Sequence, residues 1–390
     1  MSKKIIILGA GMVGRIMALD LAKKHDVTSV DLSKETLKRF KEGSGVKTQQ
    51  ADLSDSEAVK KLIADFDIVL CAVPGFMGFK TLKTIIETGK NVIDISFFPE
   101  NALELNDLAK RNGVTAIVDC GVAPGMSNLL LGYYNEKMQL TDFDCIVGGL
   151  PKIKKWPFNY KAPFSPIDVI EEYTRPARYV ENGEIVVKPA MSDVEHVEIA
   201  GVGTLEAFNT DGLRSILFTM PHIPNRKEKT LRYPGHIEKV TALRDSGFFS
   251  RQPVKVNGVD VIPLEFTSRI LFNEWKLGET EEEITVMRIT LTGTENRIRK
   301  QIVYHLHDEY DTVTQASSMA RTTGYTATAA INLFAEGLFK EKGIFPLELV
   351  GKYENCFNYF LNYLKERNVV YKKEEIILGP MNKKVNEFSE

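Results

Sequence analysis

Cysteine is scarce in this 390-residue sequence, which has four scattered cysteines and no CxxC pair. That spacing indicates neither a disulfide framework nor a zinc site. Two further features are missing: an apolar run of the roughly 20 residues that a spanning helix needs, and a charged-then-apolar leader at the N-terminus. We therefore expect a cytoplasmic protein that has no bound metal and does not contact a membrane.

An excess of charge of either sign is also absent. Fifty Lys and Arg residues stand against 52 Asp and Glu residues, so the formal net charge is -2. This balance gives no electrostatic reason to expect nucleic-acid binding. A composition of 43% hydrophobic and 26% charged residues is that of an ordinary globular protein. The length favours two domains.

The most informative stretch is Gly9-Ala10-Gly11-Met12-Val13-Gly14. The run 3–8 before it predicts a buried parallel strand, and residues 15–22 after it have helical periodicity. In such a strand–turn–helix unit the first glycine makes the turn, the second lets a pyrophosphate approach, and the third allows close helix packing. The helix N-terminus also attracts phosphate. The alternative is a glycine-rich turn without a ligand. The candidate cofactor contacts here are Gly9, Gly11, Met12, Val13 and Gly14.

A second apolar strand, over residues 27–30, ends on Asp31. A carboxylate at this position accepts hydrogen bonds from the adenosine ribose hydroxyls and repels a 2′-phosphate, which favours NAD over NADP. Ligands bind at the carboxyl ends of parallel strands. We therefore expect further cofactor contacts at the ends of the next strands, from Asp52, Leu53, Ala72, Val73, Pro74 and Ser96.

The order of the expected elements divides the chain into three parts. Six strands alternate with helices over residues 1–123, which predicts an α/β Rossmann domain with a doubly wound parallel sheet. The many candidate strands over residues 124–318 predict a second domain of the α+β class, with a mixed sheet, and we expect this domain to hold the substrate. Small residues at helical spacing over 317–333 predict that the C-terminal helices of 319–390 return and pack against the first domain.

Four polar residues are candidates for the chemistry. Asp119 ends the last strand of the first domain, where a nicotinamide would lie; it either serves as a base with a pKa raised by burial or caps the next turn. His236 titrates in the range useful for proton transfer, with a structural hydrogen bond as the alternative. Arg232 either binds a substrate carboxylate or forms an ordinary salt bridge. Glu206, on an apolar strand, needs a buried partner: a substrate ammonium, or an internal Arg or Lys.

Several motifs resemble those of the saccharopine dehydrogenase/reductase-like family, and the resemblance runs from Ile5 to about Lys373. They are Gly121-Val122-Ala123-Pro124-Gly125-Met126 with Asn128, Val147-Gly148-Gly149-Leu150-Pro151, Gly203-Thr204-Leu205-Glu206-Ala207-Phe208, Leu231-Arg232-Tyr233-Pro234-Gly235-His236 with Glu238-Lys239, and Met319-Ala320-Arg321-Thr322-Thr323-Gly324-Tyr325. The Leu-Arg-Tyr-Pro-Gly-His run is similar throughout the family. The Gly-Val-Ala-Pro-Gly-Met run lacks the acidic residue that saccharopine reductases tend to carry before the proline, and so resembles the lysine 6-dehydrogenase branch.

The resemblance implies hydride transfer between a nicotinamide and an amine or imine carbon. For that branch, L-lysine, NAD and water would give 2-aminoadipate 6-semialdehyde, which cyclises, together with ammonium and NADH. The resemblance also implies a homo-oligomer, a dimer or larger, joined through the second domain. Two alternatives stay open. One is a saccharopine or carboxynorspermidine reductase, which usually uses NADP, and the other is a non-catalytic NAD-binding sensor.

Overall fold

The N-terminal strand lies near the middle of a seven-stranded sheet in which every pair of neighbours is parallel. The computed structural model describes residues 2–163, 166–278 and 280–380. The strand order β17-β6-β5-β4-β1-β2-β3 is that of a doubly wound sheet, as expected. The strands are β1 (Lys4–Leu8), β2 (Asp26–Asp31), β3 (Val46–Gln50), β4 (Ile68–Cys71), β5 (Asn91–Asp94), β6 (Thr115–Val118) and β17 (Gly343–Pro346).

Apolar layers cover both faces of this sheet, which is why its central strands are almost wholly apolar. Helices α3 (Ser56–Ile63), α4 (Gly75–Glu87) and α5 (Asn106–Arg111) and the 3-10 helix η1 (Ala102–Leu105) pack in one layer, and α1 (Met12–Leu21) packs in the other. The short helix α2 (Lys34–Leu37) follows β2. The N-terminal strands and helices are therefore those of the predicted Rossmann domain.

The seventh strand, β17, was not predicted. The sequence indicated a sheet of six strands, all from the N-terminal part of the chain. It comes from the C-terminal segment and pairs with β6 at the edge of the sheet. A four-residue run ending in proline is too short to separate a strand from a loop by periodicity. The C-terminal segment therefore completes the first sheet.

The second domain is built on a mixed sheet of nine strands. Its central pair, β7 (Gln139–Pro151) and β12 (Asn225–Arg232), is parallel, whereas β7 pairs antiparallel with β15 (Glu283–Glu295). The sheet confirms the expected α+β architecture. Its other strands are β8 (Ala177–Glu181), β9 (Glu184–Lys188), β10 (Glu195–Ile199), β11 (Gly203–Asn209), β16 (Ile298–Glu309) and β18 (Tyr371–Pro380).

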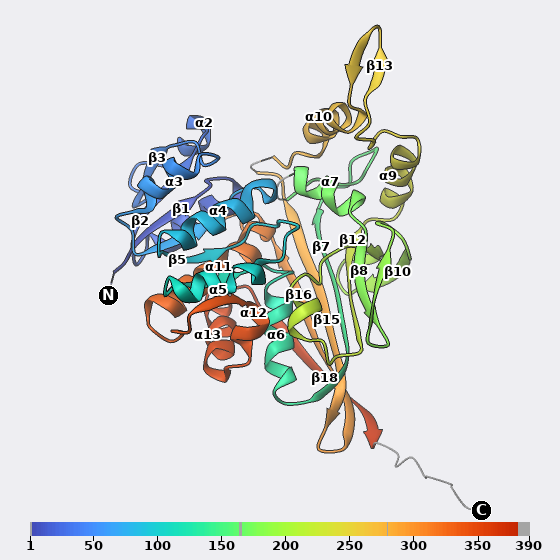
Figure 1. The fold of residues 1–390 in the computed structure, drawn as a ribbon. Helices are drawn as coiled ribbons and strands as arrows, with labels where there is room; N and C mark the ends of the chain where they lie inside the picture. The colour runs from blue at the N-terminus through green and yellow to red at the C-terminus, as the bar shows by residue number, and fades with distance from the viewer. Residues whose placement is uncertain (1, 164–165, 279, 381–390) are drawn as a thin grey trace, which may run out of the picture.

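Helices and a small hairpin surround this sheet (Figure 1). The hairpin of β13 (Val254–Val256) and β14 (Val259–Val261) projects beyond helix α10 (Pro263–Trp275). The other helices of the second half are α6 (Met126–Asn135), α7 (Pro166–Thr174), α8 (Ile216–Thr219), α9 (His236–Asp245), α11 (Ser318–Ala335), α12 (Leu347–Gly351) and α13 (Glu354–Lys365).

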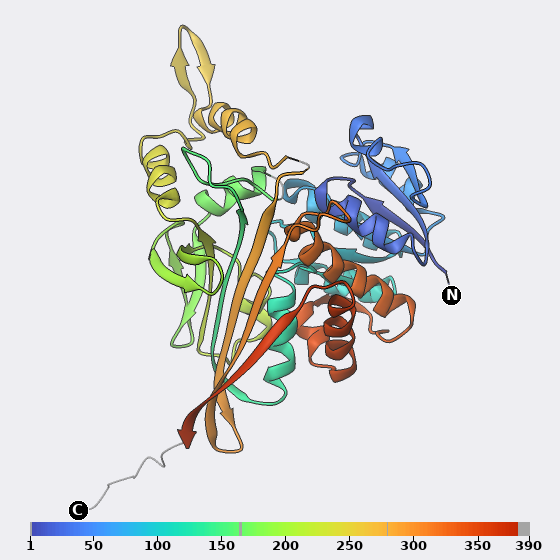
Figure 2. The same ribbon diagram turned by 180° about the vertical axis from the view of Figure 1, so that it is seen from behind.

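Helix α11 lies between the two sheets, as the view from behind shows (Figure 2). It contacts α1 on one side and β15 and β16 on the other. Gly324 permits the close approach to α1, because a Cβ at this position would lie 3.1 Å from Met17 Cγ. The small-residue helix therefore returns to the first domain, whereas β18, farther along the chain, pairs with β16 in the second sheet. Residues 381–390 of the predicted C-terminal part lie outside the described residues.

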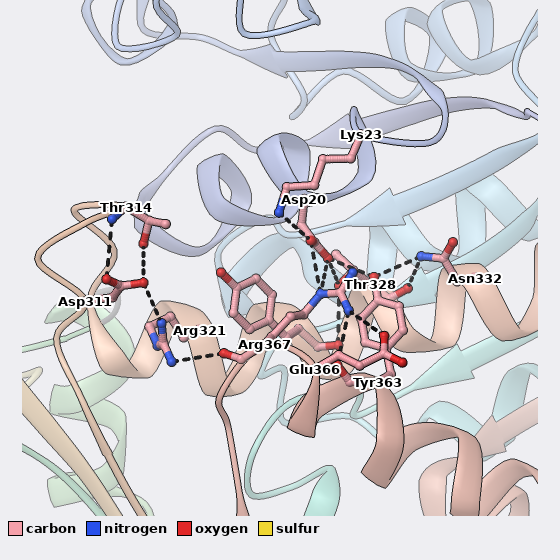
Figure 3. A network of polar contacts seen from close by, with 11 residues as sticks. Asp20, Lys23, Asp311, Thr314, Arg321, Thr328, Asn332, Tyr363, Glu366 and Arg367 are labelled. Atoms are coloured by element: carbon pink, nitrogen blue, oxygen red, sulfur yellow. Dashed lines mark hydrogen bonds and ion pairs between the residues drawn. The ribbon is translucent and has the colours of Figure 1, made fainter.

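A polar network around Asp20 ties α1 to the C-terminal helices (Figure 3). The Asp20 carboxylate, with its side chain 1% exposed, accepts hydrogen bonds from Thr328 Oγ1 at 2.8 Å, Tyr363 OH at 2.8 Å and Arg367 Nε at 2.9 Å. Burial opposes ionisation of Asp20, but the Arg367 guanidinium together with the hydrogen bonds from Thr328 and Tyr363 outweighs it, so the pKa of Asp20 is lowered. The helix that carries the glycine turn is therefore fixed by two distant segments.

Candidate active site

A cavity of about 950 Å3 lies between the two domains, at the carboxyl edge of the parallel sheet. Its lining begins at the glycine turn and Asp31 and continues over the residues that follow β4, β5 and β6. It ends on β7, β12 and α7 of the second domain. Open α/β sheets bind their ligands at this edge. The cavity therefore joins the predicted cofactor site to the predicted substrate domain.

The glycine turn has the geometry that a pyrophosphate needs. Gly9 has a φ of +111°, and a Cβ there would lie 2.4 Å from the Ala72 carbonyl oxygen. A Cβ on Gly11 would have no neighbour within 4 Å, so this residue faces open space in the cavity lining. Helix α1 begins directly after Gly11 and has no acidic residue in its first turn. The residues present thus fit a dinucleotide, with its phosphates at the N-terminus of α1.

Asp31 lines the same end of the cavity as the glycine turn. Its carboxylate accepts hydrogen bonds from the backbone N–H groups of Ala10 at 2.9 Å and Ser33 at 2.8 Å, which fix its position beside the turn. Arg39 and Thr36 line the same end of the cavity, and our sequence analysis did not name them. Asp31 suits a ribose 2′-hydroxyl, whereas an arginine in this region suits a 2′-phosphate.

The other predicted cofactor contacts divide into two groups. Ala72, Val73, Pro74 and Ser96 line the cavity together with Met12, Val13 and Gly14. Asp52 and Leu53 are not among the lining residues. The Asp52 carboxylate accepts hydrogen bonds from the backbone and hydroxyl of Ser54, and Leu53 packs against the apolar layer of the sheet. Both residues thus lie outside the cavity lining, and their contact with a cofactor stays a prediction.

Asp119 lies in the cavity wall directly after β6, as its position in the sequence predicts. It has a left-handed backbone with a φ of +52°. Its Oδ1 forms an ion pair at 2.8 Å with Nε of Arg214, and both side chains are buried. Burial raises the pKa of Asp119, whereas the Arg214 charge opposes that rise. Arg214 comes from the loop after β11, and no sequence signal pointed to it.

Arg232 lines the opposite part of the cavity, where four of its N–H groups have partners. Nε donates to Tyr173 OH, Nη1 to the Leu231 carbonyl, and Nη2 to Tyr160 OH and to Glu172 Oε2 at 2.9 Å. The residue is 2% exposed. Arg232 therefore forms a salt bridge with Glu172, which is one of the two roles expected for it. These contacts hold the guanidinium in the cavity wall.

His236 is not placed where a proton-transfer group would be needed. It is completely buried, is not among the residues that line the cavity, and lies in an aromatic cluster around Trp275. Its Nε2 contacts Tyr173 OH at 2.9 Å and its Nδ1 contacts the Phe158 carbonyl at 3.0 Å. Burial and the nearby Arg232 charge lower the pKa of His236 to about 3. The structure thus gives His236 the contacts of the structural alternative, and its proton-transfer role stays a prediction.

Glu206 also has a structural role. Its carboxylate accepts hydrogen bonds from the backbone N–H groups of Gly235 at 2.8 Å and Ile237 at 3.4 Å, at the start of α9. Within the described residues no Arg or Lys pairs with it; the N-terminus of α9 does, and a helix N-terminus stabilises a carboxylate. His196 Nε2 also lies 3.9 Å from Glu206 Oε1. His236 and Glu206 therefore belong to the framework that holds β11, β12 and α9 together.

The structure adds acidic residues that our sequence analysis did not name. Strand β12 carries Glu228, Thr230 and Arg232 on one face, and all three line the cavity. Counting back from Arg232 in steps of two along β12 reaches Thr230 and then Glu228. Glu172 and Asp211, from α7 and from the loop after β11, also line it, and only the tertiary structure brings them there.

The described residues carry neither of two features that would indicate another class of function. No group of three or more His, Cys, Asp or Glu side chains that could hold a metal ion is found in this part of the chain. Among its helices, none is long and apolar enough to cross a membrane.

Two family models match nearly the whole chain. "Saccharopine dehydrogenase NADP binding domain" matches residues 5–117, and "Saccharopine dehydrogenase C-terminal domain" matches residues 121–370. Among solved structures, apo saccharopine dehydrogenase (L-Glu forming) from Saccharomyces cerevisiae superimposes with a TM-score of 0.76 at 21% identity, and covers 96% of this chain and 100% of that one. This match shows the same fold.

The curated relatives align with this chain over different shares of their own length. Alpha-aminoadipic semialdehyde synthase of Arabidopsis thaliana is 27% identical over 66% of this chain but only 28% of its own length. Saccharopine dehydrogenase [NADP(+), L-glutamate-forming] of Saccharomyces cerevisiae is 27% identical over 63% of this chain and 58% of its own. Carboxyaminopropylagmatine dehydrogenase of Synechocystis is 22% identical over 88% of this chain and 92% of its own.

Proposed function

The chain belongs to the saccharopine dehydrogenase family, and from this premise we propose that it is an NAD-dependent oxidoreductase that deaminates the ε-carbon of L-lysine. The product would be 2-aminoadipate 6-semialdehyde, which cyclises, with release of ammonium. Two relatives are named as dehydrogenases of carboxyaminopropylagmatine and of saccharopine, which both contain carbon–nitrogen bonds. The choice of lysine rests on the Gly121–Met126 motif and on the charge of the cavity.

The observation that carries the proposal is one continuous cavity with a dinucleotide turn at one end and several carboxyl groups at the other. Asp119 lines the cavity from the first domain, and Glu172, Asp211 and Glu228 line it from the second. The cations of that wall are Arg175, Arg232 and Lys276, and most N–H groups of Arg232 are already used within the protein. Carboxylates attract ammonium groups, of which lysine has two. Saccharopine carries more carboxylates and needs more free cations.

The proposal gives the residues of this cavity separate tasks. When bound, the nicotinamide supplies the hydride acceptor, and the glycine turn with Asp31 holds its dinucleotide. Asp119, fixed by Arg214, places negative charge beside the carbon that becomes positive as hydride leaves. Arg175 and Lys276, which also line the cavity, are candidate anchors for the α-carboxylate.

A second candidate is a dehydrogenase of a larger secondary amine. It is favoured by the alignment with the Synechocystis relative, which covers nearly the full length of both chains. Arg39 beside Asp31 also keeps NADP as the alternative cofactor. A larger secondary amine would have to fill more of the cavity than lysine does.

Isotope labelling tests the lysine proposal directly. The purified protein is incubated with NAD and L-lysine carrying 15N at either the ε or the α position, and the released ammonium is analysed by mass spectrometry. We expect labelled ammonium only from the ε-labelled substrate, in equal amount to NADH. Label from the α position, or no ammonium from lysine while saccharopine is oxidised, would contradict the proposal.

The proposal includes a homo-oligomer joined through the second domain. The projecting hairpin exposes Val254, Val256 and Val259, which a second copy of the chain would cover. Sedimentation equilibrium is expected to give a multiple of the mass of one chain, and a monomer at micromolar concentration would contradict this part of the proposal.

A further inference from the structure

Glu228 is the carboxyl group of the cavity whose local partner is missing. It lies on β12, is 4% exposed, and lines the cavity. Its Oε2 atom is buried and has no hydrogen-bond partner within the described residues. Its Oε1 lies so close to Gly212 that a Cβ there would approach it to 1.7 Å. A buried acceptor without a partner is costly for a folded protein, and so points to a ligand that supplies one.

The neighbouring carboxylates, in contrast, each have an arginine. Asp119 pairs with Arg214 at 2.8 Å, and Glu172 pairs with Arg232 at 2.9 Å. Asp211 receives two hydrogen bonds from Arg178, at 2.9 and 2.8 Å. Glu228 forms no such pair with a cation of the described chain.

The groups that face Glu228 are mostly acidic or neutral. Burial, followed by the charges of Glu172, Asp211 and Asp119, raises the pKa of Glu228 to about 8, and Arg214 only partly opposes this rise. Cys145 lies opposite Glu228 on β7. The Tyr179 hydroxyl of β8 donates a hydrogen bond to the backbone carbonyl of Glu228. A cation that entered the cavity would therefore meet a carboxyl group that ionises readily once it is paired.

We propose that Glu228 binds the reacting ammonium of the substrate and takes its proton. The inference rests on the proposed function, and it assigns the general base that the sequence left open. Asp119 is the weaker candidate, because its carboxylate is already engaged by Arg214. Glu172 is engaged in the same way by Arg232.

The proton balance of the step can be written in full. An N–H bond of the substrate ammonium breaks, and the proton goes to Glu228, which leaves a neutral amine. The adjacent carbon would then lose a hydride and be oxidised to an iminium, and a nicotinamide dinucleotide held by the glycine turn and Asp31 would supply the hydride acceptor, which takes up both electrons. Water adds to that carbon, and the C–N bond breaks to release ammonium and the aldehyde. The proton on Glu228 passes to solvent as the one proton the reaction releases.

The test measures binding separately from turnover. L-lysine is titrated into the enzyme–NADH complex, where no hydride can be accepted, and the dissociation constant is measured by calorimetry in two buffers of different ionisation enthalpy. Glu228→Gln keeps the shape of the side chain and removes its charge. Glu184→Gln is the control, because Glu184 is an exposed carboxylate of β9 that lies outside the cavity lining.

We expect Glu228→Gln to weaken L-lysine binding by at least about 30-fold and to abolish the buffer-dependent proton release seen in the wild type. Its kcat should fall by about 10² to 10⁴, and the rise of kcat/KM toward a plateau above pH 8 should disappear. Glu184→Gln should stay within about threefold of the wild type. Gly212→Ala, which displaces the Glu228 carboxyl without changing its charge, should weaken binding and keep a pH-dependent limb.

The outcomes separate this inference from the proposed function. If the wild type oxidises L-lysine and Glu228→Gln binds and oxidises it equally well, Glu228 is not the base, and the lysine proposal stands. If the wild type oxidises another amine instead, the lysine proposal fails, and the same variants titrated with that amine decide the role of Glu228. If the wild-type complex binds no amine from a panel of primary and secondary amines, both are overturned.

Discussion

Replacing Asp31 by asparagine tests whether this carboxylate selects NAD. The structure places the carboxylate beside the glycine turn, where it accepts hydrogen bonds from the backbone N–H groups of Ala10 and Ser33. An asparagine side chain has one oxygen to accept with and directs an NH2 group at the other donor. The variant therefore loses both the charge and part of the local geometry, while the side-chain volume stays nearly the same.

The size of the effect can be worked out from the two cofactors. A hydrogen bond to a charged acceptor contributes about 1.5–3 kcal/mol, so weakened contacts to two ribose hydroxyls cost about 3 kcal/mol, or about 100-fold in KM for NAD. Removing a charge about 5 Å from a 2′-phosphate relieves a repulsion on the order of 2 kcal/mol, so KM for NADP falls by about 30-fold. The preference for NAD over NADP should therefore change by about 10³-fold.

The assay is initial-rate kinetics with each cofactor at saturating L-lysine. Asp65→Asn is the control, because Asp65 is exposed just after α3 in the same domain. Arg39→Ala in the Asp31→Asn background should reverse the gain for NADP, since Arg39 lines the same end of the cavity. A wild-type protein that prefers NADP, or an Asp31→Asn variant with an unchanged cofactor ratio, would refute this reasoning.

Three further predictions concern other parts of the molecule. Asp20→Ala should lower the free energy of unfolding by about 4 kcal/mol, because it strands buried donors and the Arg367 guanidinium; urea unfolding measures this, and a loss under 1 kcal/mol would contradict it. Since the folded pKa of Asp20 is lowered, its contribution should be present above pH 4 and disappear as pH falls through the folded pKa. Asp119→Asn should lower kcat/KM by about 100-fold and leave KM for NAD within threefold, which steady-state kinetics with both substrates varied can check. His236→Gln should leave the pH profile of kcat/KM between pH 6 and 9 unchanged, because the pKa of His236 is about 3; a shifted profile would restore its proton-transfer role.

The sequence predicted the architecture well wherever a strong local pattern carried it. The glycine turn, Asp31 and the alternating strands of the first domain depend on periodicity and turn chemistry, which are local properties. The strand β17 was missed because its pairing partner β6 lies far away in the chain. The return of α11 to the first domain was predicted from its small residues.

The site was predicted less completely, because polar residues were judged without their tertiary partners. His236 and Glu206 belong to a family motif, yet their contacts are an aromatic cluster and a helix N-terminus. Asp119 and Arg232 do line the cavity, each with a partner from a segment that no local pattern connects to it. Their catalytic roles stay predictions. A motif indicates that a residue matters to the fold or to the chemistry, and only its surroundings distinguish the two.

The most direct test of the central claim is the rate of NADH or NADPH formation with L-lysine, saccharopine, carboxynorspermidine and L-ornithine, each measured with NAD and with NADP. Our account predicts that L-lysine with NAD has the highest kcat/KM and that ammonium is released in equal amount to NADH. Oxidation of saccharopine or carboxynorspermidine without oxidation of lysine would contradict the substrate assignment. Tight NAD binding with no oxidation of any of the four amines would contradict the lysine dehydrogenase assignment and favour a sensor.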